Sequence, residues 1–89
     1  MKAIMTVISA DRVGIIAEIT TLLASMSVNI LDLSQTIMDG IFTMTILVDT
    51  STSHYGFEEI RTALSEKGES ANLTIRIQRA DIFNAMHRI

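Results

Sequence analysis

The hydrophobic pattern of the chain changes its period once within the first quarter. A run of β-branched and apolar residues over 2–9 predicts a strand. From residue 13 onward, apolar residues recur at spacings of three and four, which predicts an amphipathic helix over 13–26. The apolar face of this helix is made of Ile15, Ile16, Ile19, Leu22, Leu23 and Met26. We interpret this face as core packing.

Residues 28–48 predict a β-hairpin. Asp39-Gly40 suits a two-residue turn in which both φ angles are positive, so Met38 pairs with Ile41 and the pairing continues residue by residue. One face then carries Leu31, Leu33, Gln35 and Ile37 opposite Phe42, Met44, Ile46 and Val48. The other carries Asp32, Ser34, Thr36 and Met38 opposite Ile41, Thr43, Thr45 and Leu47. A slip of one residue would mix the two faces. We therefore expect the first face on helices and the second against water or another copy of the sheet.

The rest of the chain predicts a helix, a strand and a final short helix. The polar stretch 49–53 suits a loop that caps a helix, and helical spacing then continues to Gly68, a plausible stop. Alternation over 73–78 predicts a half-buried strand. A last apolar face predicts a helix over about 80–88, which is too short to be stable alone and has to dock on another surface. That face consists of Ile82, Phe83, Met86 and Ile89.

This order predicts a single α+β domain over 1–89 with a βαββαβ core at 2–78. It is the ferredoxin-like arrangement, a four-stranded antiparallel sheet of order 4-1-3-2 with both main helices on one face. The second strand lies at an edge and offers unpaired backbone groups to another chain. Because 89 residues build only a small core, we expect at least a homodimer.

Composition removes several classes of function. The chain has no cysteine, which excludes disulfides, Cys-ligated zinc and thiol catalysis and fits a reducing compartment, so we expect a cytoplasmic location. A net charge of −3 with dispersed Lys and Arg disfavours nucleic acid. No apolar run is long enough to span a membrane. His54 and His87 are isolated and no nucleophile–base pair is visible. We expect no metal, no cofactor and no catalysis.

Candidate chemistry concentrates in the loop Asp11-Arg12-Val13-Gly14-Ile15-Ile16. A short loop between a strand and a helix leaves helix N–H groups unpaired, and these donors with the helix dipole attract a carboxylate or phosphate. Gly14 permits a positive φ angle or close approach by a ligand. Asp11 can cap the helix or contact a ligand cation, whereas Arg12 fits a solvated surface charge. A turn that serves only for capping and geometry matches the same residues.

Asp11-Arg12-Val13-Gly14-Ile15, the amphipathic helix after it, and Ser27-Val28-Asn29-Ile30 together resemble an ACT domain over residues 2–78. The ending at 82–89 resembles small free-standing ACT proteins of the UPF0237 type. The resemblance implies a regulatory module that senses a small molecule, most often an amino acid, at the interface of two copies. It implies that the ligand meets the loop and the start of the second strand. Carried onto this chain, the site residues are Asp11, Arg12, Val13, Gly14, Ile15 and Asn29.

Two positions depart from the family pattern. Val13 stands where many members have proline, and Ser9 where some amino-acid-binding members have histidine. Asn29 could also cap the turn between helix and strand. Our main hypothesis is a small-molecule sensor that alters association with another protein. We keep two alternatives to it. One is a structural protein-interaction module with an empty loop. The other is an acylphosphatase-like hydrolase, which would use Arg12 and Asn29.

Overall fold

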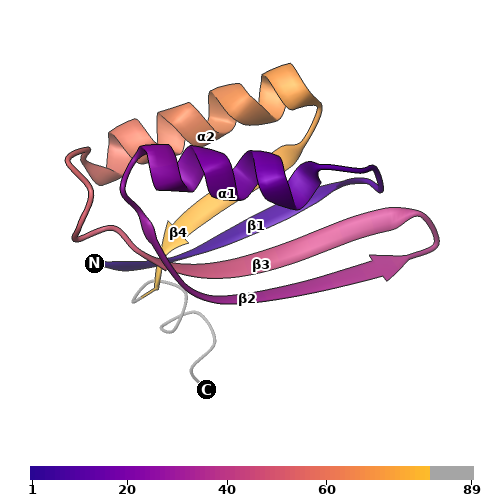
Figure 1. The fold of residues 1–89 in the computed structure, drawn as a ribbon, viewed down its shortest axis with the longest axis horizontal. Helices are drawn as coiled ribbons and strands as arrows, with labels where there is room; N and C mark the ends of the chain where they lie inside the picture. Colours follow the sequence, from indigo (N-terminus) through magenta and orange to yellow (C-terminus); the bar gives the residue numbers. More distant parts are fainter. Residues whose placement is uncertain (81–89) are drawn as a thin grey trace.

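The computed structural model describes residues 1–80, and its four-stranded sheet carries two helices on one face (Figure 1). The elements are β1 (Lys2–Ala10), α1 (Ile15–Ser25), β2 (Asn29–Met38), β3 (Ile41–Asp49), α2 (Phe57–Ala71) and β4 (Thr74–Arg79). The strand order is β2-β3-β1-β4 and every pairing is antiparallel. This confirms the predicted ferredoxin-like topology. The C-terminal helix predicted at about 80–88 falls on residues that lie, apart from Ala80, outside the described part of the chain.

The β2–β3 hairpin follows the predicted register over most of its length. Asp39 and Gly40 have φ angles of 52° and 77°, and pairing runs as predicted from Met38–Ile41 to Asp32–Leu47. The register then shifts, so that Ile30 rather than Leu31 pairs with Val48. The predicted place of Leu31 on the core face is therefore wrong. A β-bulge inserts one extra residue; here it returns Val28 and Ile30 to the core side and leaves Leu31 exposed.

The core lies between the two central strands and the helices. Its largest fully buried side chains are Met5 and Val7 of β1, Met44, Ile46 and Val48 of β3, Ile15, Ile19 and Leu23 of α1, and Ile60 and Leu64 of α2. The expectation that one hairpin face packs on helices holds for β3. It fails for Gln35 and Ile37 of β2, which are exposed because the hairpin tip extends past α1 (Figure 1).

Gly68 does not end the second helix, contrary to the prediction. It lies buried inside α2, which continues to Ala71, and Asn72 supplies the left-handed residue with a φ angle of 61°. A Cβ at Gly68 would lie 2.7 Å from the carbonyl oxygen of Leu73. The N–H of Leu73 donates to the Gly68 carbonyl at 2.8 Å. The glycine is therefore needed because the chain that leads into β4 passes close to the helix backbone at this point.

Candidate functional site

The loop between β1 and α1 is held against the hairpin turn. The backbone N–H of Asp11 donates to the carbonyl of Gly40 at 2.9 Å. Gly14 is the N-cap of α1 and has a φ angle of 93°, which confirms the positive φ expected there. No side chain caps the helix, so the idea that Asp11 is its cap is wrong. The loop therefore presents a helix start that its own side chains do not satisfy.

The first intrahelical hydrogen bond of α1 runs from the N–H of Glu18 to the carbonyl of Gly14 at 2.9 Å. The amides of Ile15, Ile16 and Ala17 accordingly have no acceptor within the helix. Val13, beside them, is 99% exposed. The helix start thus has one exposed apolar side chain beside three amides without helical acceptors.

A hollow of about 480 Å³ opens between this loop and the hairpin, and we call it the loop hollow. Its residues are Asp11, Arg12, Gly14, Ile15, Ile16 and Ala17 from the loop and α1, and Gln35, Ile37 and Phe42 from the hairpin. Ile16 was expected on the core face of α1, but it is exposed and lines this hollow. The three hairpin residues were not predicted as site residues. Gln35 had one signal, since it is the only polar residue on the predicted apolar face of β2.

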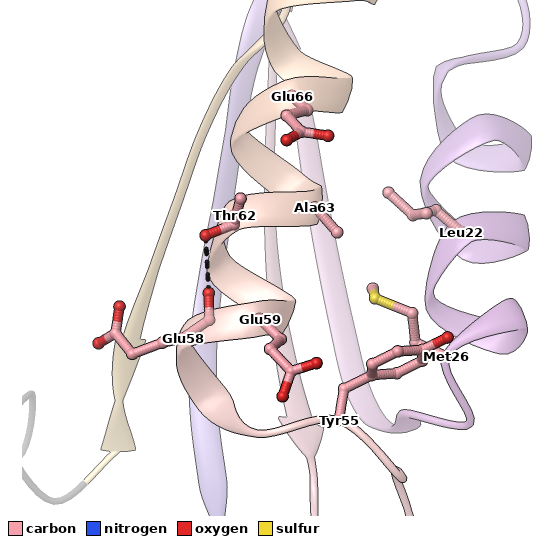
Figure 2. A pocket seen from close by; sticks show the side chains of 8 residues that line it. All are labelled: Leu22, Met26, Tyr55, Glu58, Glu59, Thr62, Ala63 and Glu66. Atoms are coloured by element: carbon pink, nitrogen blue, oxygen red, sulfur yellow. Dashed lines mark hydrogen bonds between the residues drawn. The ribbon is translucent and has the colours of Figure 1, made fainter.

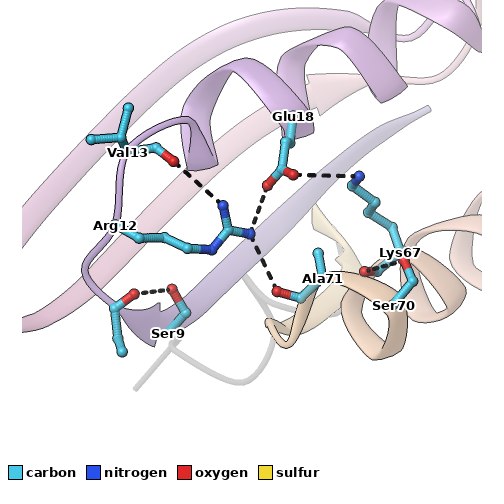
Figure 3. Close-up of polar contacts among 8 residues, drawn as sticks. Ser9, Arg12, Val13, Glu18, Lys67, Ser70 and Ala71 are labelled. Atoms are coloured by element: carbon cyan, nitrogen blue, oxygen red, sulfur yellow. Dashed lines mark hydrogen bonds and ion pairs between the residues drawn. The ribbon is translucent and has the colours of Figure 1, made fainter.

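Arg12 forms a bridge between the loop and the end of α2 (Figure 3). Its Nη2 lies 2.7 Å from Oε2 of Glu18 and 3.2 Å from the carbonyl oxygen of Ala71, and Nη1 lies 3.5 Å from the Val13 carbonyl oxygen. Lys67 places its Nζ 3.8 Å from the other oxygen of Glu18. Arg12 is therefore engaged in the fold and is not the solvated charge that its sequence context suggested.

The charges around Glu18 favour its ionised form. The hydrogen bond from Arg12 lowers the pKa of the Glu18 carboxyl below its ordinary value of 4.5. Partial desolvation raises this pKa, whereas the positive charges of Arg12 and Lys67 lower it further. The acidic residue of the first turn of α1 is thus held by side chains of other segments.

Asn29 lies far from the loop within one chain. It is the first residue of β2 and pairs with Asp49, whereas the loop is attached at the opposite end of the hairpin, at Gly40. At about 3.3 Å per residue, the length of β2 separates the two by roughly 30 Å. Five of the six predicted site residues therefore gather in one place, and Asn29 does not join them within one chain.

A second hollow, the helix groove, lies between α1 and α2 (Figure 2). It measures about 480 Å³; Leu22, Met26, Tyr55 and Ala63 contribute apolar surface, and Glu58, Glu59, Thr62 and Glu66 line it on the α2 side. The hydroxyl of Thr62 donates to the backbone carbonyl of Glu58 at 2.9 Å. The groove was not predicted from the sequence, because only the packing of two helices creates it.

Over residues 1–80, no group of three or more His, Cys, Asp or Glu side chains is placed to hold a metal ion. In the same range, no helix is long and apolar enough to cross a membrane.

Comparison with known proteins decides the family. The ACT domain model matches residues 2–78. The chain belongs to the ACT domain family. A UPF0237 protein of Clostridium acetobutylicum is 52% identical over 89 residues, and one of Listeria innocua is 49% identical, each over the full length of both chains. This ACT domain is thus similar to small proteins of its own length.

Solved structures agree with this assignment. An ACT domain protein from Streptococcus pneumoniae is 40% identical, covers 93% of each chain and superposes with a TM-score of 0.83. The regulatory subunit of aspartate kinase from Thermus thermophilus is 18% identical, with 86% of this chain and 50% of that chain covered and a TM-score of 0.68, so it shows the fold alone.

Proposed function

We propose that this ACT domain is a non-catalytic regulatory module that binds a small carboxylate-bearing metabolite, such as an amino acid, in the loop hollow. The observation that carries the proposal is the start of α1, where three amides without helical acceptors border the hollow behind a left-handed Gly14. Such amides, together with the positive end of the helix dipole, favour a carboxylate.

The other groups of the hollow suit the rest of an amino acid. The Asp11 carboxylate has no side-chain partner among the described residues and is exposed, so it is available to an ammonium group. Ile37 and Phe42 offer apolar surface to a side chain, and Gln35 adds an amide that can donate and accept hydrogen bonds. These features favour a zwitterion with a small, largely apolar side chain.

A homodimer would bring Asn29 into the same site. β2 is an edge strand, and two edges can pair antiparallel about a two-fold axis. If that pairing is centred near Gln35, Asn29 of the partner subunit lies beside the Asp39–Gly40 turn, which is bonded to Asp11. The site would then consist of a loop from one copy and a strand start from the other, and ligand binding would be coupled to association.

The hydrolase alternative receives less support. It needs Arg12 and Asn29 on one phosphate, but Asn29 begins the hairpin at the end away from the turn, against which the loop of Arg12 is held. The Arg12 guanidinium also already contacts Glu18 and Ala71. An assay for acylphosphate hydrolysis tests this alternative directly.

A thermal-shift screen of amino acids and small carboxylates at millimolar concentration tests the proposal. A ligand at about 100 times its dissociation constant adds roughly 2.7 kcal/mol, which for a domain of this size raises the melting temperature by on the order of 10 °C. Asp11→Asn should weaken that ligand about tenfold by removing the ammonium partner. Glu69→Gln makes the same charge change on α2 and should leave affinity unchanged.

Two results would count against the proposal. If no compound shifts the wild-type melt, the empty structural module is the better hypothesis. If Asp11→Asn and Glu69→Gln bind the ligand equally well, the protein is a sensor whose site lies elsewhere. Sedimentation with and without the ligand then shows whether binding changes association.

A further inference from the structure

The sheet has one face that neither α1 nor α2 covers, opposite the face on which these two helices pack (Figure 1). Side chains alternate along a strand, so the neighbours of the core residues on each strand point to this side, which we call the open face. The open face shares no residue with the loop hollow or the helix groove. Its members are Lys2, Ile4, Thr6, Ile8 and Ala10 of β1, Asp32, Ser34, Thr36 and Met38 of β2, Ile41, Thr43, Thr45, Leu47 and Asp49 of β3, and Thr74, Arg76 and Gln78 of β4.

The open face is apolar at the end that carries the hairpin turn. The strand register places Ala10, Ile41 and Met38 side by side across three strands, and Ile8 lies on the same face of β1 as Ala10. The exposed fractions of Ile8, Ile41 and Met38 are 43%, 52% and 71%. Apolar side chains that are exposed together as one patch mark an interaction surface.

Charge divides the open face into two halves. The neighbouring strands β1 and β4 carry Lys2 and Arg76 on it and no acidic residue, whereas β2 and β3 carry Asp32 and Asp49 and no basic residue. Arg76 has no hydrogen-bond or ion-pair partner among residues 1–80. Oδ1 of Asp32 accepts from the N–H of Leu33 at 2.8 Å, and its other oxygen is left for a cation. The open face is therefore complementary in charge to a second copy of itself.

We propose that a second copy of this chain packs its open face on this one, about a two-fold axis that runs parallel to the strands between β1 and β3. Aligned packing of two sheets is one of the common arrangements of sheet on sheet. This axis lays β1 over β3 of the partner and β4 over β2 of the partner. The basic half of each open face then covers the acidic half of the other.

The strand register brings the charged residues together across this axis. Arg76 shares a row of the sheet with Ser34, because Thr6 pairs with both Arg76 and Thr45, and Thr45 pairs with Ser34. Arg76 therefore lies over Ser34 of the partner subunit, and Asp32 of the partner subunit is two residues, or about 7 Å, further along β2. A guanidinium on its long side chain spans that offset. The two-fold axis makes the contact twice.

The uncharged side chains of the open face match across the same axis. Ile4 lies opposite Leu47 of the partner subunit, and Ala10 lies opposite Ile41 of the partner subunit. A two-fold axis perpendicular to the strands would instead lay β4 on β4 and bring Arg76 beside Arg76 of the partner subunit. The distribution of charge thus favours the axis parallel to the strands.

The open face is large enough for a specific dimer. Four strands spaced by about 4.8 Å and nine residues rising about 3.3 Å each give a face of roughly 19 by 30 Å. Two copies would bury on the order of 1,200 Å², the lower end of the range for specific interfaces. This dimer is separate from any pairing of β2 edges and does not rest on the proposed ligand.

Sedimentation equilibrium of two charge variants and of their mixture tests the proposal in the full chain. Arg76→Glu and Asp32→Arg, each alone, place like charges against each other twice in the dimer, so the dissociation constant should rise at least about tenfold. In a dimer formed by one chain of each variant, both contacts again join opposite charges. An equimolar mixture should therefore associate within about threefold of wild type. Glu69→Arg, a charge reversal on α2, is the matched control and should associate like wild type.

Restoration by mixing requires contact between two chains, because a defect within one chain would persist in the mixture. The proposal is overturned if Arg76→Glu associates as tightly as wild type or if mixing restores nothing. A wild-type chain that stays monomeric at about 200 μM would overturn it as well. None of these results bears on the loop hollow, whose ligand is detected by thermal shift.

A second measurement uses the middle of the open face. Thr45 lies on β3, which is paired on both sides, so Thr45→Lys leaves the β2 edge untouched. In the dimer its ammonium would be buried against Thr6 of the partner subunit, and the dissociation constant should rise about tenfold or more. Thr62→Lys makes the same substitution on α2 and should leave association unchanged. Equal association of the two lysine variants would overturn the proposal.

Discussion

The two helices of this ACT domain both begin after a glycine, but the two glycines differ in conformation and the two first turns differ in charge. At α2, Gly56 is extended with a φ angle of −74°, and Oε1 of Glu59 accepts from its N–H at 3.4 Å. Glu58 and Glu59 place two carboxylates at the positive end of that helix. No side chain caps the first-turn amides of either helix. At α1, however, Gly14 is left-handed, and the one acidic residue of the first turn, Glu18, is held by Arg12 and Lys67.

The contrast shows which helix start is available to an external anion. Carboxylates near a helix N-terminus stabilise the helix and reduce its attraction for other anions. α2 supplies these groups from its own sequence, whereas α1 has a glycine and apolar residues where they would stand. The same sequence thus builds one helix start that carries two carboxylates of its own and one whose single carboxylate is held by other side chains, and only the second borders the loop hollow.

Among the substitutions that test this difference between the helix starts, we expect Gly14→Val to have the largest effect on stability and ligand binding. A β-branched residue resists a φ angle of 93°, and nothing lies within 4 Å of a Cβ built there, so backbone strain rather than a clash causes the loss. We expect the free energy of unfolding to fall by about 2 kcal/mol and ligand-induced stabilisation to disappear. Chemical denaturation with and without the ligand measures both effects.

Gly56→Val is the matched control for that substitution. Its φ angle is negative and its Cβ would make only an ordinary contact of 3.7 Å with Glu59. The loss should therefore be smaller, about 1 kcal/mol or less, and ligand binding should persist. If both glycine variants lose the same stability, the two helix starts do not differ as described.

A smaller effect is expected when α1 receives the carboxylate that α2 already has. Ala17 occupies the position relative to Gly14 that Glu59 occupies relative to Gly56. Ala17→Glu should raise the unfolding free energy of the ligand-free protein by about 0.5 kcal/mol and weaken a carboxylate ligand by about tenfold. Ala17→Gln, the neutral control, should do neither. Tighter binding by the Glu variant would show that the ligand's carboxylate does not lie at this helix start.

The smallest effect concerns pH. Because the pKa of Glu18 is lowered in the folded protein, chiefly by the hydrogen bond from Arg12, the ionised carboxylate contributes stability above its unfolded pKa. That contribution is lost as the pH falls below 4.5 through the folded value. The melting temperatures of wild type and Glu18→Gln should therefore differ at neutral pH and converge in acid. A difference that stays constant down to pH 3 would mean that the charge of Glu18 contributes nothing.

Much of the fold could be predicted because the turn residues and the apolar pattern of the strands indicate the same structure. Asp39-Gly40 determined the turn, and alternation on both sides determined the register as far as Asp32. The bulge at Leu31 could not be predicted. Ile30 and Leu31 are both apolar, so the sequence does not show which of them faces the core, and only the packing places Ile30 there. Gly68 suggested a helix stop because a glycine needed for close approach and one needed for positive φ look the same in a sequence.

The candidate site was predictable in its loop but not in its walls. Strand, glycine and helix made the loop visible as consecutive residues. Gln35, Ile37 and Phe42 join it only through tertiary structure, where the bond between Asp11 and Gly40 sets the loop beside the hairpin. Arg12 was misjudged for the same reason, because its partner Ala71 lies far away in the sequence.

The bulge in β2 also bears on aggregation. An edge strand with a continuous row of free N–H and C=O groups is a template on which further strands can add without limit. The shift between Ile30 and Asp32 interrupts that row and changes the twist, so an incoming strand can follow one ladder only along Asp32–Met38. A single extra residue in this edge strand thus limits the length of the strand along which a neighbouring molecule can pair with it.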